Sequence, residues 1–271
     1  MNDRPIGVFD SGIGGLTVLK EMIRELPWEN TVYLGDTARV PYGIRSAETV
    51  TRYSFENTGF LVAEGIKLLV VACNTASAVS LDAIKEKVSI PVIGVIEPGA
   101  KGAVVATRNK RVGVIGTEAT VRSNAYARII KTIDHGIEVF SLPCPLFVPL
   151  AEEGLTDDDI ATLVAERYLG NLKDKEIDTL VLGCTHYPLP KGVISQIMGR
   201  GIVLIDSAIE TVREIKKILH EHAIEGNRVE GTSAPLRRFY VTDATDRFVK
   251  VGERFLGQRI EHIEKINVGG N

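Results

Sequence analysis

Two segments of this chain, one in each half, repeat one pattern. They are residues 68–75, with the sequence LLVVACNT, and residues 179–186, with the sequence TLVLGCTH. Each begins with a short, uninterrupted apolar run rich in β-branched side chains, which is typical of a strand buried on both faces of a sheet. Such strands occur mainly in parallel sheets that helices cover on both sides. Each segment also places a cysteine, Cys73 or Cys184, at the carboxyl end of its strand.

Strand-like runs alternate with longer stretches of helical apolar spacing along the chain. The predicted strands cover residues 6–9, 31–34, 68–72, 92–95, 112–115, 180–182 and 202–205, and residues 237–242 predict another, followed by a helix with Asp246 near its start. The predicted helices include residues 46–63, 77–87 and 157–171. This alternation predicts an α/β fold with mainly parallel sheets, in which ligands bind at the carboxyl ends of the strands.

The repeat extends beyond the cysteines. Asp10 ends a strand-like run upstream of Cys73, and Gly116 ends one at a similar separation upstream of Cys184. Strand-like runs also follow both cysteines at equal separation, around Ile93 and Leu204. Three matched strands in the same order predict two similar α/β domains, related by a pseudo-twofold axis, with the two cysteines flanking a cleft between them.

No glycine-, serine- or proline-rich linker separates the two predicted domains. Residues 97–99 follow the fourth strand and mark the expected crossing into the second domain, and residues 206–207 mark the return. The tail of the chain has no counterpart in the repeat. We therefore assign residues 1–97 and 207–271 to the first domain, which carries Cys73, and residues 98–206 to the second, which carries Cys184.

Charge and hydropathy limit the partners and the compartment that we expect. The 32 basic and 35 acidic residues leave a net charge of -3, without a basic block that would favour nucleic acid or an anionic membrane. No apolar stretch approaches the roughly 18 residues of a membrane span, and the start lacks a signal-peptide pattern. Three cysteines argue against a disulfide framework. We expect a cytoplasmic protein with reduced thiols that acts on a small polar metabolite.

The first loop, residues 10–17 with the sequence DSGIGGLT, joins a strand to a helix. Its backbone N–H groups suit an anionic group such as a carboxylate or a phosphate. The spacing fits neither a Walker loop nor the Gly-x-Gly-x-x-Gly fingerprint. The alternative is an ordinary glycine turn in which Asp10 or Ser11 caps the helix.

Both cysteines stand where a thiol can be activated. Cys73 lies between a strand and a small-residue helix start, where the helix dipole favours the thiolate, and Cys184 occupies an equivalent position. A single buried cysteine is commonly structural, but matched positions at the ligand-binding edge favour chemistry. His186 follows Cys184 by two residues and suits a proton donor or a group that tunes the thiol. Cys144, between two prolines, is interpreted as structural, and no metal site is predicted.

Carboxylates follow the strands in both halves. Asp36 and residues 41–43 come just after the second strand, and residues 152–153 occupy the corresponding part of the second half. They can bind a substrate ammonium or assist the thiols, or they are ordinary surface residues. The duplicated cysteines favour proton transfer, because a racemase needs one acid/base group on each face of a stereocentre, whereas a hydrolase needs one nucleophile.

Four motifs together resemble the bacterial glutamate racemases over essentially the whole chain. They are FDSGIGGL at residues 9–16, DTARVPYG at residues 36–43, ACNTAS at residues 72–77 and GCTHYP at residues 183–188. The resemblance implies a cofactor-independent isomerase that interconverts L- and D-glutamate and supplies D-glutamate for peptidoglycan synthesis. It also implies a homodimer.

The resemblance further implies roles for individual residues. Cys73 would remove the α-proton of D-glutamate and Cys184 that of L-glutamate, with Asp10 and His186 as auxiliary acid/base groups. Asp36 and Glu152 would be more distant catalytic contributors. The implied substrate contacts are Asp10, Ser11, Tyr42, Gly43, Asn74, Thr75, Thr117, Thr120, Thr185 and His186.

Three alternatives stay open from the residues alone. One is a sister racemase that acts on aspartate or another amino acid. Another is a cysteine hydrolase or acyl transferase that uses Cys184 and His186. The third is a non-catalytic thiol or metal-binding module. A pyridoxal-phosphate racemase is disfavoured because no lysine stands in a Schiff-base and phosphate-binding constellation.

Overall fold

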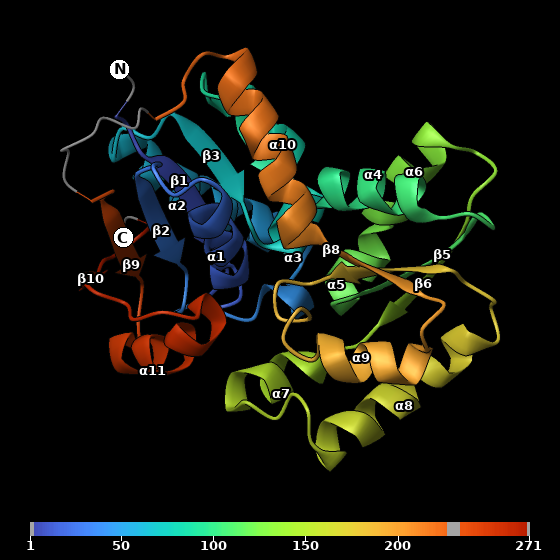
Figure 1. Ribbon diagram of the computed structural model, residues 1–271. Coiled ribbons are helices and arrows are strands. Elements are labelled where there is room, and N and C mark those ends of the chain that lie inside the picture. The colour runs from blue at the N-terminus through green and yellow to red at the C-terminus, as the bar shows by residue number, and fades with distance from the viewer. Residues whose placement is uncertain (1–2, 227–233, 270–271) are drawn as a thin grey trace.

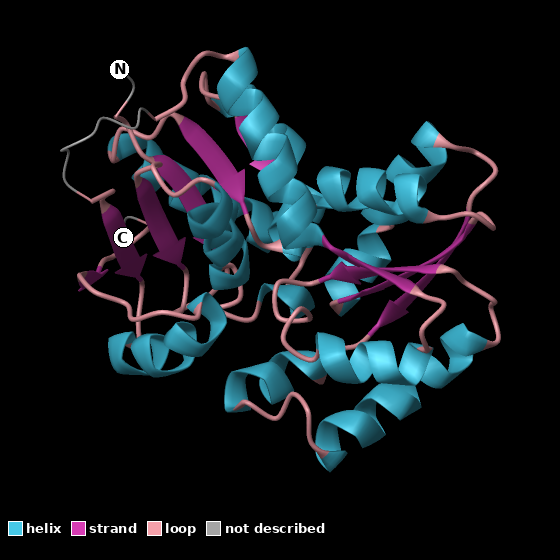
Figure 2. Cartoon of the chain, in the orientation of Figure 1, coloured by secondary structure: helices cyan, strands magenta, loops and turns pink. Residues whose placement is uncertain are grey.

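The strands form two separate sheets, and all their pairings are parallel. In the computed structural model, which describes residues 3–226 and 234–269, one sheet has the order β10-β9-β2-β1-β3-β4 and the other the order β6-β5-β7-β8 (Figure 1). We call these sheet A and sheet B. Helices alternate with the strands along the chain (Figure 2). The α/β class with parallel sheets, predicted from the sequence, is confirmed.

The strands of sheet A come from both ends of the chain. They are β1 (Ile6–Asp10), β2 (Thr31–Gly35), β3 (Leu68–Val71), β4 (Val92–Gly94), β9 (Arg237–Val241) and β10 (Ile263–Lys265). Sheet B is built from β5 (Arg111–Gly116), β6 (Glu138–Pro143), β7 (Thr179–Gly183) and β8 (Val203–Asp206). The sequence predictions omitted β6 and β10, both of which lie at sheet edges and are only partly buried.

Helices cover both faces of each sheet, which is why the central strands are apolar throughout. On sheet A, Val8 packs into the core beneath α1 (Leu16–Glu25), α10 (Ser207–Glu221) and α11 (Thr245–Leu256), whereas Phe9 packs into the core beneath α2 (Ala47–Ala63) and α3 (Asn74–Lys87). On sheet B, the core beneath α7 (Phe147–Glu153), α8 (Asp159–Lys173) and α9 (Lys191–Met198) lies opposite that beneath α4 (Ile96–Ala106) and α6 (Ala125–Ile133).

Both sheets reverse their strand order at equivalent points. In sheet A the chain passes from β1 outward to β2 and then returns to β3 on the other side of β1. In sheet B it passes from β5 outward to β6 and returns to β7 on the other side of β5. Ligands of open α/β sheets bind at such switch points, at the carboxyl ends of the strands. Cys73 and Cys184 follow β3 and β7, so both cysteines lie at a switch point.

The chain crosses between the sheets through helices. Residues 97–99, expected as the crossing, lie in the first turn of α4, where the missing N–H of Pro98 leaves no helical hydrogen bond unmade. From Ile96 onward α4 packs on sheet B, and α10 leads back to sheet A. Figure 1 shows α4 and α10 meeting between the two sheets. The domain boundaries after residues 97 and 206, and the pseudo-twofold relation, stay predictions.

The termini of the elements near the site have local causes. Ser46 caps α2 by accepting a hydrogen bond from the Thr49 N–H, and Thr117 caps the short helix α5 (Glu118–Ser123) in the same way. A 3-10 turn, η1 (Tyr42–Ile44), precedes α2. Within the described residues, no helix has the length and apolar character needed to span a membrane.

Candidate active site

A cavity of about 180 Å³ lies where the switch points of the two sheets face each other. This volume is below the range of about 300–1,000 Å³ that is typical of drug-sized ligands, so the cavity suits a molecule of amino-acid size. Its lining comes from the segments that follow β1, β2, β3, β5, β6 and β7, which include loops and the first turns of the next helices. The lining residues are Ser11, Val40, Pro41, Tyr42, Gly43, Ile44, Cys73, Asn74, Thr75, Thr117, Glu118, Pro145, Val148, Pro149, Cys184, Thr185 and His186.

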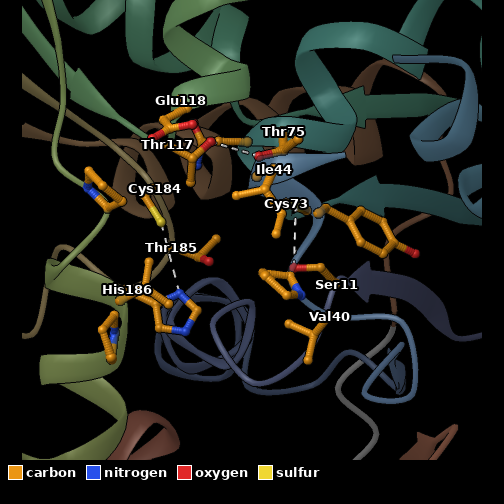
Figure 3. Close-up of a pocket in the computed structure, with 17 residues that line it drawn as sticks. Ser11, Val40, Ile44, Cys73, Thr75, Thr117, Glu118, Cys184, Thr185 and His186 are labelled. Carbon is orange, nitrogen blue, oxygen red and sulfur yellow. Dashed lines mark hydrogen bonds between the residues drawn. The ribbon is translucent and has the colours of Figure 1, made fainter. Parts of the chain in front are cut away.

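The two cysteines approach this cavity from different sheets. Figure 3 shows Cys73 and Cys184 on opposite sides of it. Cys73 is 6% exposed and immediately precedes α3, and its thiol donates a hydrogen bond to the Ser11 hydroxyl oxygen over 3.7 Å. Cys184 is 5% exposed, and its Sγ lies 3.9 Å from His186 Nδ1. A small molecule held between them would meet one thiol on each side.

Burial keeps the proton on Cys73. Burial, with a smaller contribution from the nearby Asp10 carboxylate, raises the pKa of the Cys73 thiol to about 12, although the Ala76 backbone N–H and Ser11 act in the opposite direction. The backbone N–H at the start of α3 favours the thiolate, as the sequence predicts, but burial outweighs it. One turn of helix dipole does not offset the loss of hydration. Cys73 is therefore a protonated thiol at neutral pH.

His186 connects Cys184 to a carboxylate. Its Nε2 lies 3.1 Å from Glu152 Oε1, whereas the other ring nitrogen, Nδ1, faces Cys184. Burial lowers the pKa of His186, but hydrogen bonds to Cys184 and Glu152, together with the charges of Cys184 and Asp10, raise it to about 10. The hydrogen bond from His186 in turn lowers the pKa of Glu152. His186 is therefore an imidazolium at neutral pH, beside the second thiol.

This imidazolium makes the stability of the fold pH-dependent. The folded state raises the pKa of His186 from 6.5 to about 10, so its contribution is complete below pH 6.5 and declines as the pH rises towards 10. We expect the free energy of unfolding to fall as the pH rises from 6.5 to 9. In His186→Asn, the dependence of this free energy on pH should be weaker. Urea unfolding at several pH values measures this. A wild-type slope equal to that of the variant would contradict it.

Asp10 lies beneath the cavity and does not line it. Its side chain is fully buried, Oδ2 accepts a hydrogen bond from the Gly12 N–H at 2.9 Å, and Oδ1 has no hydrogen-bond partner among the described residues. Burial raises the pKa of Asp10, and the charge of His186 opposes this rise. Asp10 thus affects both Cys73 and His186 through its charge, although it is not itself a lining residue.

Asp36 is also predicted as a catalytic residue, and the structure places it away from the cavity. Its buried carboxylate accepts hydrogen bonds from Arg39 Nε at 2.7 Å, from Thr242 Oγ1 at 3.0 Å and from the Tyr42 hydroxyl. Asn57 Nδ2 donates to the same Tyr42 hydroxyl at 3.1 Å. Asp36 therefore holds the segment whose Tyr42 and Gly43 line the cavity.

The remaining predicted residues form a mainly hydroxyl- and amide-rich wall. Thr75 Oγ1 lies 2.9 Å from Thr117 Oγ1, as Figure 3 shows, and 3.4 Å from Thr120 Oγ1. Thr120 itself stands behind this pair and, like Glu152, does not line the cavity. No lysine or arginine is among the described lining residues, and no described group of three or more His, Cys, Asp or Glu residues has the arrangement of a metal site.

Sequence reasoning missed two groups of residues at this site. Val40, Ile44, Pro145, Val148 and Pro149 give the cavity an apolar rim, but nothing in their local pattern marks them as lining residues. Arg247, from α11, donates to Glu152 Oε2 at 3.2 Å and so holds the carboxylate that contacts His186. The two residues are 95 positions apart, so only the packing of the fold brings them together.

Known proteins match this chain over nearly its whole length. The family model described as Asp/Glu/Hydantoin racemase matches residues 6–215. A glutamate racemase of Geobacter metallireducens is 54% identical over 266 residues, which cover 98% of this chain and 97% of that protein. The crystal structure of a glutamate racemase isoform from Bacillus anthracis superposes with a TM-score of 0.94 at 42% identity, covering 98% of each chain. The crystal structure of a glutamate racemase from Francisella tularensis, in complex with D-glutamate, superposes with a TM-score of 0.91 at 42% identity and also covers 98% of each chain.

Proposed function

Because this chain belongs to the Asp/Glu/hydantoin racemase family, we propose that it is a glutamate racemase that uses two cysteines and no cofactor. The observation that carries the proposal is the pair of nearly buried thiols on opposite sides of one small cavity (Figure 3). A hydrolase with a Cys184–His186 pair would leave Cys73 unexplained. The similarity to several glutamate racemases, including one bound to D-glutamate, supports glutamate as the substrate.

In the direction from L- to D-glutamate, Cys184 acts as the base. Its thiolate takes the α-proton of L-glutamate, so that an S–H bond forms and the C–H electron pair stays on the α-carbon. The Cys73 thiol then donates its proton to the opposite face, which yields D-glutamate and a Cys73 thiolate. The raised pKa of Cys73 supports this starting state, because the acid must be protonated before turnover. The reverse direction exchanges the two roles.

The surrounding residues supply charge and exclude water. The His186 imidazolium places a positive charge 3.9 Å from Cys184 Sγ, and the buried Asp10 carboxylate disfavours a second negative charge at Cys73. The carbanion that forms next to a carboxylate needs preorganised donors in a dry site. Side chains and backbone of the lining residues can provide them, and we assign the substrate contacts to Ser11, Tyr42, Gly43, Asn74, Thr75, Thr117, Thr185 and His186. Asp36, Thr120 and Glu152 support these residues from behind.

Isotope exchange tests the proposal directly. The protein is incubated with L-glutamate in D2O without added cofactor, and both α-hydrogen loss and chirality are followed. Deuterated D-glutamate is the expected product, and D-glutamate as the starting material should give deuterated L-glutamate. Absence of exchange with either enantiomer would reject glutamate as the substrate. Aspartate, run in parallel, tests the sister activity.

Replacing Glu152 by glutamine should weaken catalysis without abolishing it. The amide oxygen still accepts the His186 hydrogen bond, but this bond is no longer charge-assisted and therefore raises the pKa of His186 less. We expect kcat to fall about tenfold, in the range of one charge-assisted hydrogen bond, and the alkaline limb of the kcat profile to move to lower pH. Glu153→Gln, beside it on α7, is the control, since the side chain of Glu153 pairs with Arg247 and, among the described residues, makes no hydrogen bond to His186. An unchanged pH profile in Glu152→Gln would contradict the role.

The physiological context follows from the same proposal. D-Glutamate made in the cytoplasm would supply peptidoglycan synthesis, and the family resemblance implies a homodimer. Sedimentation equilibrium tests the oligomeric state. Growth of a D-glutamate auxotroph on expression of this chain tests the supply of D-glutamate to the cell wall, and failure of an active enzyme to restore growth would argue against that role.

A further inference from the structure

Asn74 carries an unused donor at the cavity. It is the first residue of α3, is 2% exposed and lines the cavity next to Cys73. Its Oδ1 accepts a hydrogen bond, but its Nδ2 has no hydrogen-bond partner among the described residues. Buried N–H groups without a partner are rare because the loss of hydration is costly. A vacant donor on a cavity-lining side chain therefore calls for a ligand acceptor.

The hydrogen-bond donor to Asn74 Oδ1 is Tyr126, which lies on a helix that packs against sheet B. The Tyr126 hydroxyl, on α6, donates to Asn74 Oδ1 at 2.7 Å, and the tyrosine is 2% exposed. Because the Tyr126 hydroxyl donates to the amide oxygen, a flip of the amide would break this bond and require the hydroxyl hydrogen to turn to another acceptor. The bond therefore favours the orientation in which Oδ1 faces Tyr126 and Nδ2 stays available.

Packing holds Tyr126 in this place. A Cβ atom added at Gly99, on α4, would lie 3.2 Å from both Cε1 and Oη of Tyr126, so the helix passes close to the tyrosine ring. Tyr126 and Ile130 belong to the core between α4, α6 and sheet B. The Tyr126 hydroxyl is therefore held in place by the core of sheet B, whereas Asn74 belongs to a helix that packs on sheet A.

We propose that Tyr126 is a positioning residue that orients the Asn74 amide, so that Nδ2 donates a hydrogen bond to a carboxylate oxygen of the bound amino acid. This inference rests on the proposed function. The proposal specifies which group of the amino acid Asn74 binds. Because Nδ2 can only donate hydrogen bonds, it binds a carboxylate oxygen, which accepts them, and not the ammonium group, which is itself a donor. The ammonium must then be bound elsewhere in the cavity.

A double-mutant cycle tests whether Tyr126 acts through Asn74. KM and kcat for L- and D-glutamate are measured in wild type, Tyr126→Phe, Asn74→Ala and the double variant. We expect Tyr126→Phe to raise KM roughly tenfold, the factor of about one hydrogen bond, with kcat within about threefold of wild type. In the Asn74→Ala background the same change should leave KM unaltered. An equal rise in KM in both backgrounds would overturn the proposal.

The matched control is Tyr187→Phe. Tyr187 is also fully buried, and its hydroxyl donates to the Cys144 carbonyl oxygen at 2.7 Å, within the core beneath α7 and α9. We expect a similar fall in Tm for the two tyrosine variants but a raised KM only in Tyr126→Phe. An equal rise in KM in both would mean that loss of a buried hydroxyl, and not the orientation of Asn74, causes the effect.

Asn74→Asp tests the polarity of the contact. The aspartate still accepts the Tyr126 hydrogen bond but has a negative oxygen where the N–H2 group was. We expect KM for glutamate to rise more than tenfold, and an unchanged or lowered KM would overturn the proposal because it would place the ammonium there. If the wild-type protein racemises glutamate but the variants do not show the KM changes expected here, only this inference fails. If wild type does not racemise glutamate, the proposed function fails first and this inference with it.

Discussion

Cys73→Ala and Cys184→Ala should each lose racemisation in both directions, by about 10³- to 10⁴-fold, the upper range for a positioned acid/base group. Each variant lacks either the base that takes the α-proton or the acid that returns one, and reversal of the substrate only exchanges those roles. The loss should therefore be symmetric for L- and D-glutamate. Polarimetry with both enantiomers measures it, together with circular dichroism to confirm folding.

Isotope exchange separates the two variants. In Cys73→Ala the thiolate of Cys184 can still remove the α-proton of L-glutamate, so slow exchange with D2O without inversion is expected on that face. Cys184→Ala should show the corresponding exchange with D-glutamate. Full racemisation by one variant would exclude a two-base mechanism and favour a single nucleophile.

Cys144→Ala is the matched control for both variants. This third cysteine is fully buried, as the other two nearly are, but it does not line the cavity, and its thiol donates weakly to the Leu142 carbonyl oxygen at 3.8 Å. We expect its removal to cost stability through a small void, with activity within about twofold of wild type. Activity loss in Cys144→Ala equal to that of the other two would mean that any buried cysteine is needed for folding.

The sequence predicts the buried strands well because burial on both faces leaves an uninterrupted apolar run. The strand at residues 68–72 appears as β3, one residue shorter. The edge strand β6, with the sequence EVFSLP, lacks such a run because it is only partly covered, and the predictions omit it. The start of α3 is predicted three residues too late, at residue 77, because the small polar residues 74–76 carry no helical apolar spacing. These residues are helical because they pack at the cavity.

The same reasoning finds the site residues that follow the switch-point strands, and also Tyr42 and Gly43 after β2, but it wrongly expects Asp36 at the cavity. Cys73 and Cys184 are predicted correctly as lining residues because β3 and β7 end at the cavity. Asp36 follows β2, one strand away from the switch point between β1 and β3, and its carboxylate contacts Arg39 and Tyr42 instead. Tyr126 and Arg247 lie on helices, and no local pattern shows that a helix of one sheet will meet the loops of the other.

Gly14→Ala should reduce kcat by about 10²-fold although residue 14 bears no functional group. Gly14 lies in the loop before α1, where a Cβ atom would stand 2.2 Å from Thr185 Oγ1 and 2.5 Å from His186 Nδ1, compared with ordinary contacts of 3.4 Å or more. The loop after β7 must therefore retreat by about 1 Å, taking His186 with it. Displacements of this size can cost about 10²-fold in rate.

A hydrogen bond from Thr17 means that a shift of the loop after β7 also disturbs its attachment to α1. Thr17 Oγ1 donates to the Thr185 carbonyl oxygen at 2.9 Å, so the start of α1 and the loop that carries Cys184 are joined at the same point. A methyl group at position 14 separates these partners and moves Cys184 away from Cys73. The effect should fall on kcat in both directions, and the pKa of His186 should decrease as its hydrogen bonds to Cys184 and Glu152 lengthen.

Gly12→Ala distinguishes this steric effect from a general need for glycine in the loop. A Cβ atom at position 12 would meet Val40 Cγ2 at 3.5 Å, an ordinary contact, and the backbone N–H that binds Asp10 would be kept. We expect near-wild-type kcat for Gly12→Ala and the large loss only for Gly14→Ala, measured with both enantiomers at saturating concentration. Equal losses in the two variants would attribute the effect to loop flexibility. A loss confined to Gly14→Ala would show that the position of the loop carrying Cys184 depends on the close approach of Gly14, which has no side chain, to Thr185 and His186.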